Sequence, residues 1–334
     1  MTTTAAEILL PDAPDIAGLR FRPFDPATDV ARLSELIIAS NLPDEIDYMP
    51  SEEVLRHELE HKAAFDPTRD ILLAEIDGRL VGAVETEGKV RDGTVVHYTS
   101  GWVHPDERRR GIGRALQRWA ERRAGEIKAA WSGDEPHAIG GWPDETQPGA
   151  IALFEAERYT VVRYGFMMLR PLGEALPDAP LPEGLEIRPV VEADHRRIWE
   201  ADVEAFRDHW EAAERTEEDF AGWFTEPGLD TSLWRVAWDG DEVAGSVMTM
   251  IWADENERLG VSRGWLEHVS VRRPWRRRGL AAALMVDAMR GLAERGIAEA
   301  ALGVDAENTT GALRLYESLG FRRHRTGINY RKAI

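Results

Sequence analysis

The stretch Arg276-Arg277-Arg278-Gly279-Leu280-Ala281 has a second copy in the chain, Arg108-Arg109-Arg110-Gly111-Ile112-Gly113. Each copy follows a segment of strand character that ends in valine, Val271 or Val103, and each opens an amphipathic helix. A cationic turn with small residues at a helix N-terminus is suited to bind a multiply charged anion, above all a diphosphate. The repetition of this turn in one context predicts a tandem duplication, so each half has to be interpreted separately.

The duplication extends beyond the two arginine–glycine turns. Gly18-Leu19-Arg20-Phe21-Arg22-Pro23 is matched by Gly184-Leu185-Glu186-Ile187-Arg188-Pro189. Between this motif and the turn, each half has an Asp-Gly pair, Asp77-Gly78 or Asp239-Gly240, that separates two apolar runs and predicts a β-hairpin. The shared order and nearly constant spacing of these features indicate two homologous domains rather than a short-period repeat.

Length and composition bound the domain organisation. With 334 residues, the chain has room for two domains, each with its own hydrophobic core. A stretch rich in proline and glycine separates the two halves and predicts an extended, fairly stiff linker. We therefore expect an N-terminal domain over residues 1–172, a linker over residues 173–184 and a C-terminal domain over residues 185–334.

The charge balance and the absence of cysteine exclude several classes of function. The formal net charge is −19, which disfavours binding to nucleic acid or to anionic membranes. Without cysteine, the chain can form neither a disulfide nor a thiolate nucleophile. The sequence shows no targeting signal and no run of membrane-spanning length, so we expect a cytoplasmic protein, and we expect no metal site.

The second half carries further motifs around its turn. Glu267-His268-Val269-Ser270-Val271 precedes the turn, and Asn308 and Leu315-Tyr316-Glu317-Ser318-Leu319-Gly320-Phe321 follow it. Together these residues resemble the GNAT superfamily of acyl-CoA-dependent N-acetyltransferases and, more distantly, its tandem members of the mycothiol synthase type. The resemblance implies two tandem domains of mixed α/β (α+β) class, each with a mostly antiparallel central sheet, flanking helices and a splayed cofactor-binding strand pair. It also implies that the C-terminal domain is the catalytic one.

The same resemblance implies acetyl-CoA as the acyl-donor cosubstrate. The backbone of the strand before the turn would pair with the amides of the pantetheine arm, which assigns this part to Val269, Ser270 and Val271. Asn308 would contact the pantetheine arm or orient the following helix, and an ordinary helix cap explains this residue equally well. The residues expected to hold the diphosphate are Arg276, Arg277, Arg278, Gly279, Leu280 and Ala281, with Arg108, Arg109, Arg110, Gly111, Ile112 and Gly113 as their counterparts in the first half.

Two side chains of the second half are candidates for proton transfer. When an amine attacks the thioester, the leaving thiolate needs a proton, and the phenol of Tyr316 is protonated at neutral pH. The alternative for Tyr316 is an ordinary aromatic residue of the core. Glu267 is the candidate general base, with binding of the substrate ammonium or a solvated strand end as its alternatives. His268 follows it directly and is expected on the opposite side of the strand.

The first half lacks these groups at the corresponding positions. Alignment of the two halves places Phe154 opposite the tyrosine, Thr99 opposite the glutamate and Thr146 roughly opposite the asparagine. Phenylalanine cannot donate a proton. We therefore expect a catalytically degenerate domain that is structural or still binds acetyl-CoA.

The predicted function is transfer of an acetyl group from acetyl-CoA to a primary amine, on a small molecule or a peptide, by direct attack in the C-terminal domain. The alternatives are acetylation of a cysteinyl amine, as in the mycothiol synthase type, and a non-catalytic acyl-CoA sensor or scaffold. Residues 202–224 are dense in carboxylates and tryptophan, which would suit a cationic amine. Solvated acidic faces and core tryptophans explain the same segment.

Overall fold

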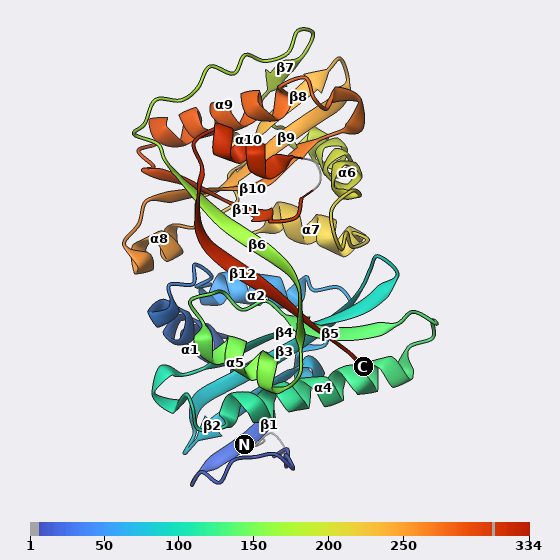
Figure 1. Ribbon diagram of the computed structural model, residues 1–334, viewed down its shortest axis with the longest axis vertical. Coiled ribbons are helices and arrows are strands. Elements are labelled where there is room, and N and C mark those ends of the chain that lie inside the picture. The colour runs from blue at the N-terminus through green and yellow to red at the C-terminus, as the bar shows by residue number, and fades with distance from the viewer. Residues whose placement is uncertain (1–6, 309–310) are drawn as a thin grey trace. The chain divides into compact units, whose positions relative to one another are not determined.

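The computed structural model describes residues 7–308 and 311–334. The chain divides into two compact units, whose elements are labelled in Figure 1. Unit 1 comprises the residues up to Arg163 together with Gly327–Ile334, and unit 2 comprises Tyr164–Thr326. Within the described ranges, no helix is long and apolar enough to cross a lipid bilayer.

Unit 1 is a mixed sheet with helices on both faces. Its first four strands pair antiparallel in chain order, and the fifth pairs in parallel with the fourth. The strands are β1 (Leu19–Pro23), β2 (Ile71–Ile76), β3 (Arg79–Arg91), β4 (Thr94–Val103) and β5 (His137–Gly141). The helices are α1 (Val30–Asn41), α2 (Glu52–Glu60), α3 (Pro67–Asp70), α4 (Ile112–Ala130) and α5 (Pro148–Ala156).

The apolar side chains of unit 1 form separate clusters on the two faces of its sheet. One cluster joins α1 and α2 to the strands through residues such as Leu33, Leu55 and Ile71. The other joins α4 to the strands through residues such as Leu72 and Leu116. Successive side chains of a strand point to opposite faces, so Ile71 and Leu72 bury themselves in different clusters. Because helices cover both faces of the sheet, β2 is apolar at successive positions rather than at alternate ones.

Unit 2 repeats this plan with the strand order β6-β11-β10-β9-β8-β7. Neighbouring strands are antiparallel except β10 and β11, which are parallel. The remaining strands of the chain are β6 (Thr160–Pro171), β7 (Glu186–Arg188), β8 (Arg235–Asp239), β9 (Glu242–Met250), β10 (Arg263–Val271), β11 (Glu299–Asp305) and β12 (Arg322–Ala333). The remaining helices are α6 (His195–Phe206), α7 (Glu217–Thr225), α8 (Ala253–Leu259), α9 (Leu280–Glu294) and α10 (Ala312–Ser318). The mixed, mostly antiparallel architecture predicted from the sequence is confirmed.

The last strand of each half begins in its own unit and ends in the other: β6 passes from unit 1 to unit 2 after residue 163, and β12 passes from unit 2 to unit 1 after residue 326. Residues 165–171 of β6, at the end of the first half, pair antiparallel with β11 in unit 2. Residues 330–333 of β12, at the end of the second half, pair antiparallel with β5 in unit 1. The compact units thus differ from the contiguous halves of the sequence, 1–172 and 185–334, by this exchange of strands.

Strand β6 carries a buried arginine that anchors the end of α10. The Arg170 guanidinium donates to the carbonyl oxygen of Leu319, directly after α10, at 2.6 Å. It also donates to the carbonyl oxygens of Pro171 and Ala175, each at 3.0 Å. The last carbonyl groups of a helix have no partner within the helix, and Arg170 supplies one. A residue from the first half of the sequence therefore holds the helix that carries Tyr316.

Candidate active site

The two parallel strands of unit 2 separate before the arginine–glycine turn. Among the described residues, β10 pairs with β11 only over residues 263–265, opposite residues 299–301. From Leu266 to Val271, β10 pairs only with β9 among the described residues. The open edge of β10 includes Val269, Ser270 and Val271. Backbone groups on this edge are available to a ligand that carries amides of its own, and the predicted splayed pair is confirmed.

The two arginine–glycine turns adopt the same backbone conformation. Gly279 has a φ of 85° and Gly111 a φ of 93°, in the left-handed region that glycine enters without strain. The second arginine of each turn, Arg277 or Arg109, is also left-handed, with a φ of 61° or 63°. The helices α9 and α4 begin directly after these glycines, so their first N–H groups lack partners within the helix. These first-turn residues are Leu280 and Ala281 in unit 2 and Ile112 and Gly113 in unit 1.

The first arginine of each turn supports the turn itself. Arg276 donates to the carbonyl oxygen of Val271 at 2.9 Å and pairs with Asp208 at 2.7 Å. Arg108 makes the same two kinds of contact in unit 1, where its carboxylate partner is Asp44 at 2.9 Å. These guanidinium groups buttress the backbone that would face the anion. The exposed arginines of the turns are Arg277, Arg278, Arg109 and Arg110.

The two turns differ in what lies over them. Among the described residues, no atom would come within 4 Å of a Cβ added to Gly279. A Cβ added to Gly111 would lie 3.2 Å from the Cβ of Pro14. Pro14, in the segment that precedes β1, therefore limits the space beside Gly111, whereas Gly279 has no such neighbour among the described residues; both glycines are exposed.

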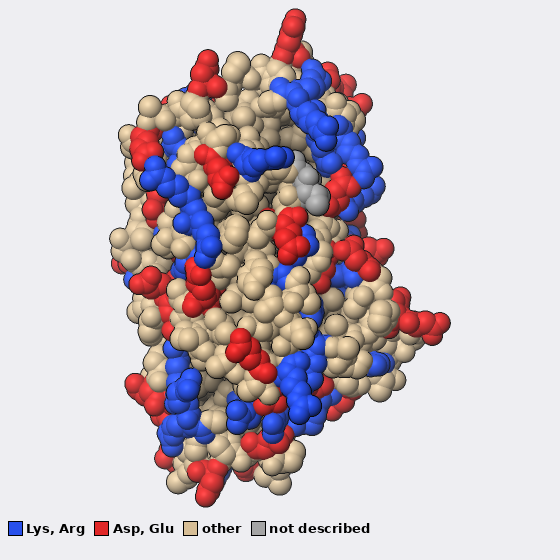
Figure 2. Space-filling model, viewed as in Figure 1, with Lys and Arg blue, Asp and Glu red and all other residues tan. Residues whose placement is uncertain are grey.

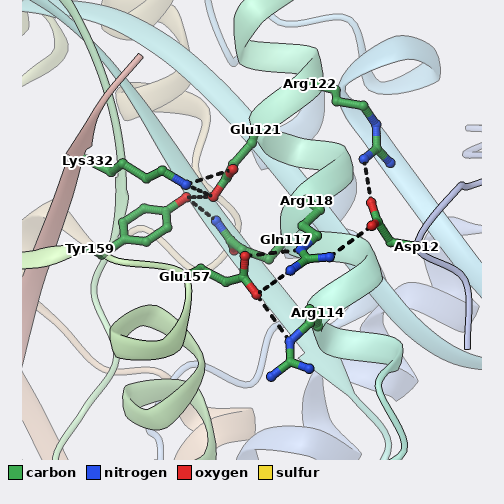
Figure 3. Close-up of polar contacts among 9 residues, drawn as sticks. All are labelled: Asp12, Arg114, Gln117, Arg118, Glu121, Arg122, Glu157, Tyr159 and Lys332. Atoms are coloured by element: carbon green, nitrogen blue, oxygen red, sulfur yellow. Dashed lines mark hydrogen bonds and ion pairs between the residues drawn. The ribbon is translucent and has the colours of Figure 1, made fainter.

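Carboxylates also engage the arginines along α4, next to the turn of unit 1 (Figure 3). Arg118 pairs with Asp12 at 2.9 Å and with Glu157 at 3.1 Å. Glu157 also pairs with Arg114 at 3.1 Å, and Asp12 with Arg122 at 3.0 Å. Figure 3 shows the two carboxylates bridging the three guanidinium groups. A diphosphate at this turn would have to compete with both carboxylates for these cations.

Helix α10 presents Tyr316 to the interior of unit 2. Only 7% of this residue is exposed, and burial raises the pKa of its phenol to about 12. Within the described chain, the hydroxyl has no hydrogen-bond partner, so its proton is not committed to another protein group. Asn308 lies just before this helix, where its Oδ1 accepts from the backbone N–H of Ala312 at 3.4 Å. The N-cap of α10 is Gly311, and Asn308 supplies an acceptor for the first N–H of the helix from three residues further back.

Glu267 is exposed and lies at a β-bulge. Its neighbours Leu266 and His268 pair with consecutive residues of β9, so Glu267 is the extra residue of the bulge. Its carboxylate accepts a hydrogen bond from the indole Nε1 of Trp252 at 3.1 Å. The side chain therefore lies toward the segment after β9.

His268 is a titratable residue of this site that the sequence analysis did not select. Its Nδ1 lies 3.0 Å from Oδ2 of Asp202, which is fully buried on α6. Its imidazole packs against the rings of Trp223 and Phe206, with centroid distances of 4.7 and 4.9 Å. Asp202 and His268 are 66 positions apart in the sequence. The sequence shows a histidine on the strand before the turn, which could have indicated a titratable group at the site. Its partner Asp202 is brought next to it only by the packing of α6 on β10.

Several carboxylates of residues 202–224 pair with arginines. Glu204 pairs with Arg272 at 2.8 Å, and Glu217 pairs with Arg196 at 2.6 Å. Figure 2 shows the same close mixing of acidic and basic side chains on the face that it draws. These ion pairs offset part of the negative charge on which the expectation of a cationic amine rested.

The unit 1 counterparts of the catalytic candidates take part in packing and turn structure. Phe154 is buried and stacks on Tyr330, with ring centroids 5.3 Å apart. The hydroxyl of Thr99 donates to the carbonyl oxygen of Gly140 at 3.1 Å, and Thr146 bonds within its own turn. These contacts agree with a domain that has lost the chemical groups of its homologue.

Comparison with known proteins identifies the family. Residues 31–140 and 195–321 match the acetyltransferase (GNAT) family. The two matches fall on the two duplicated regions, each with its splayed strand pair and its turn. The chain therefore belongs to the GNAT family, and it is an N-acetyltransferase.

Relatives and solved structures resemble the chain over nearly its full length. The mycothiol acetyltransferase of Geodermatophilus obscurus is 30% identical over 312 residues, which cover 92% of this chain and 96% of that protein. The mycothiol acetyltransferase of Salinispora tropica is 30% identical over 308 residues, which cover 91% of this chain and 93% of that protein. A GCN5-related N-acetyltransferase from Sphaerobacter thermophilus superimposes with a TM-score of 0.70 at 28% identity and covers 97% of each chain. A tandem GNAT protein from the clavulanic acid biosynthesis pathway shares the fold, with a TM-score of 0.68 at 18% identity. The superposition covers 94% of this chain and 98% of that chain.

Proposed function

We propose that unit 2 transfers an acetyl group from acetyl-CoA to a primary amine, and that unit 1 does not catalyse this reaction. The observation that carries the proposal is the difference between two otherwise matching turns. A Cβ on Gly111 would lie 3.2 Å from the Cβ of Pro14, whereas no described atom would lie within 4 Å of one on Gly279. Unit 2 also has Tyr316 where the first half of the sequence has Phe154. The splayed edge of β10 supports pairing with the pantetheine amides in the same unit.

The proposed chemistry is direct attack on the thioester. The diphosphate would bind at the N-terminus of α9, where the helix dipole and free N–H groups favour negative charge. The amine nitrogen attacks the carbonyl carbon, the C–S bond breaks and the thiolate of CoA leaves. The surroundings that raise the pKa of Tyr316 to about 12 disfavour a thiolate as well. Tyr316 is therefore the proposed donor of the proton that the sulfur takes up.

The acceptor can be identified with a panel of primary amines, assayed by mass spectrometry for free CoA and for the acetylated product. We include cysteinyl amines because relatives named mycothiol acetyltransferase are 30% identical over 92% of this chain. The expected result is CoA release with acetylation at nitrogen. Binding of acetyl-CoA without CoA release for any amine would overturn the proposal in favour of an acyl-CoA sensor.

Gly279→Ala is expected to weaken the binding of acetyl-CoA by roughly 10- to 150-fold, because a Cβ would stand between a phosphate and the turn. This range corresponds to the loss of one charge-assisted hydrogen bond, worth about 1.5–3 kcal/mol. Isothermal titration calorimetry measures the affinity and the stoichiometry.

Gly111→Ala is the control for backbone strain, because Gly111 has the same left-handed backbone, and its added Cβ also presses on Pro14 in unit 1. It should leave the affinity for acetyl-CoA nearly unchanged. Equal losses of affinity in the two variants, or binding to both turns of the wild-type chain, would contradict the assignment of the cofactor to unit 2.

A further inference from the structure

We propose that His268 accepts the proton of the attacking ammonium, and that Asp202 holds the imidazole in the tautomer that this transfer needs. The inference rests on the proposed function, since it names the proton acceptor for the same reaction in unit 2. The sequence alone points to Glu267, the neighbouring residue on β10, as the candidate general base.

Asp202 determines which imidazole nitrogen carries the proton. Its Oδ2 lies 3.0 Å from Nδ1 of His268, and an ionised carboxylate can only accept a hydrogen bond. Nδ1 is therefore the protonated nitrogen and donates to Asp202, which leaves the lone pair of the neutral ring on Nε2. Among the described residues, Nε2 has no hydrogen-bond partner, so this lone pair is open to a ligand.

The surroundings of His268 leave it reachable while they fix its orientation. Its side chain is 21% exposed, whereas Asp202 is fully buried. The rings of Trp223 and Phe206 pack against the imidazole and limit its rotation. His268 also directly precedes Val269, on the strand whose open edge is proposed to bind the pantetheine arm. The acceptor nitrogen and the thioester would thus meet along one strand.

The charged and titratable groups near His268 come from its own strand and from the segments packed against it. From α6 and the segment after it come Asp202 and His209, and burial lowers the pKa of His209. From the segment before α7 comes Arg215, which lies 3.7 Å from Oδ2 of Asp202 and 5.2 Å from the ring centre of Trp223. From its own strand comes Glu267, which bonds to Trp252. The charged group that contacts the His268 ring is thus the Asp202 carboxylate, and Arg215 approaches the same Oδ2.

An imidazole is also better matched than a carboxylate to this task. A general base works best when its pKa is close to the working pH, and the reference value is about 6.5 for histidine and about 4.3 for glutamate. Glu267 is exposed, and its carboxylate already bonds to an indole.

The proton balance closes without a further reactant. The ammonium passes a proton to Nε2 of His268, and the freed lone pair forms the bond to the carbonyl carbon. The C–S bond breaks and the sulfur takes the proton of Tyr316. The new amide nitrogen loses its second proton, which restores the phenol, and His268 releases its proton to water.

The test compares His268→Gln with Glu267→Gln in steady-state kinetics over a range of pH. His268→Gln should lower kcat by about 10²–10⁴ and flatten the acidic limb of the profile of kcat/KM against pH. The acidic limb should persist in Glu267→Gln. Asp202→Asn should lower kcat, since an amide can hold the ring in either tautomer, and Asp202→Glu should restore part of kcat. His324→Gln, an exposed histidine on β12, is the control.

Calorimetry with acetyl-CoA shows that each variant is folded, and its Kd should change by less than about twofold in His268→Gln. An intact acidic limb in His268→Gln, or its loss in Glu267→Gln, overturns the inference and leaves the proposed function standing. A wild-type chain that releases no CoA with any amine overturns the proposed function and this proton transfer together. Should the Asp202 variants fail to fold, nitrogen NMR of the wild-type imidazole decides, because a proton on Nε2 rather than Nδ1 of the neutral ring contradicts the tautomer.

Discussion

Tyr316→Phe is expected to lower kcat by about 10²–10⁴, with little change in the affinity for acetyl-CoA. The substitution removes the proton that the departing thiolate takes up. It keeps the aromatic ring, whose centroid lies 6.3 Å from the ring centroid of Phe321. Because the hydroxyl has no hydrogen-bond partner in the described chain, its removal leaves no protein group unsatisfied. The free energy of unfolding should therefore change little. Steady-state CoA release, calorimetry and thermal unfolding measure the three quantities.

Tyr159→Phe in unit 1 is the matched control, because it also removes a buried hydroxyl. The Tyr159 hydroxyl accepts from Gln117 at 2.7 Å and donates to Glu121 at 2.9 Å (Figure 3). Its loss should lower the free energy of unfolding and leave kcat unchanged. Turnover at the wild-type rate in Tyr316→Phe would remove the tyrosine from the mechanism and return it to an ordinary aromatic of the core.

Tyr330→Ala is expected to destabilise unit 1 by about 3–5 kcal/mol, although Tyr330 belongs to the second half of the sequence. Only 2% of Tyr330 is exposed, its ring stacks on Phe154, and it pairs with Gly141 of β5. Truncation leaves a cavity beside Phe154 and weakens the β5–β12 ladder. Hydrogen exchange followed by mass spectrometry should show faster exchange in β5 and α5, with β8 and β9 in unit 2 still protected.

Tyr164→Ala is the control for an aromatic truncation on an exchanged strand. Tyr164 lies on β6 and is 43% exposed, so its loss should change the free energy of unfolding by no more than about 0.5 kcal/mol. Faster hydrogen exchange in unit 2 with β5 still protected in Tyr330→Ala would contradict the pairing of β12 with β5 in unit 1.

The features that the sequence predicted well are those that depend on neighbours along the chain. The Asp-Gly pairs form the predicted hairpins, and Asp77 and Gly78 both have positive φ, as a tight two-residue turn requires. Gly279 and Gly111 take the left-handed conformation at the helix starts where the turns were expected. In each case the residue type restricts the backbone directly, so a short motif is sufficient.

The candidate site was predictable only in part, because its side chains meet through packing. Asn308 and Tyr316 could be located from a motif, but nothing in the motif indicates that Tyr316 is buried without a partner. For Glu267 and His268, alternation along a strand predicted opposite sides, and the bulge at Glu267 interrupts that alternation. The motif likewise did not show that Asp202 would lie against the histidine.

The sequence by itself predicted a duplicated chain with two arginine–glycine turns at helix starts, because glycine sterics and apolar periodicity act over a few residues, and its motifs resembled the GNAT superfamily. Only the tertiary structure decided that the ends of β6 and β12 exchange units, that Pro14 lies beside Gly111, and that Asp202 contacts His268. Strand pairing, burial and the partner of a charge depend on which distant segments come together. That outcome is set by the free energy of the whole packed fold and not by any local motif.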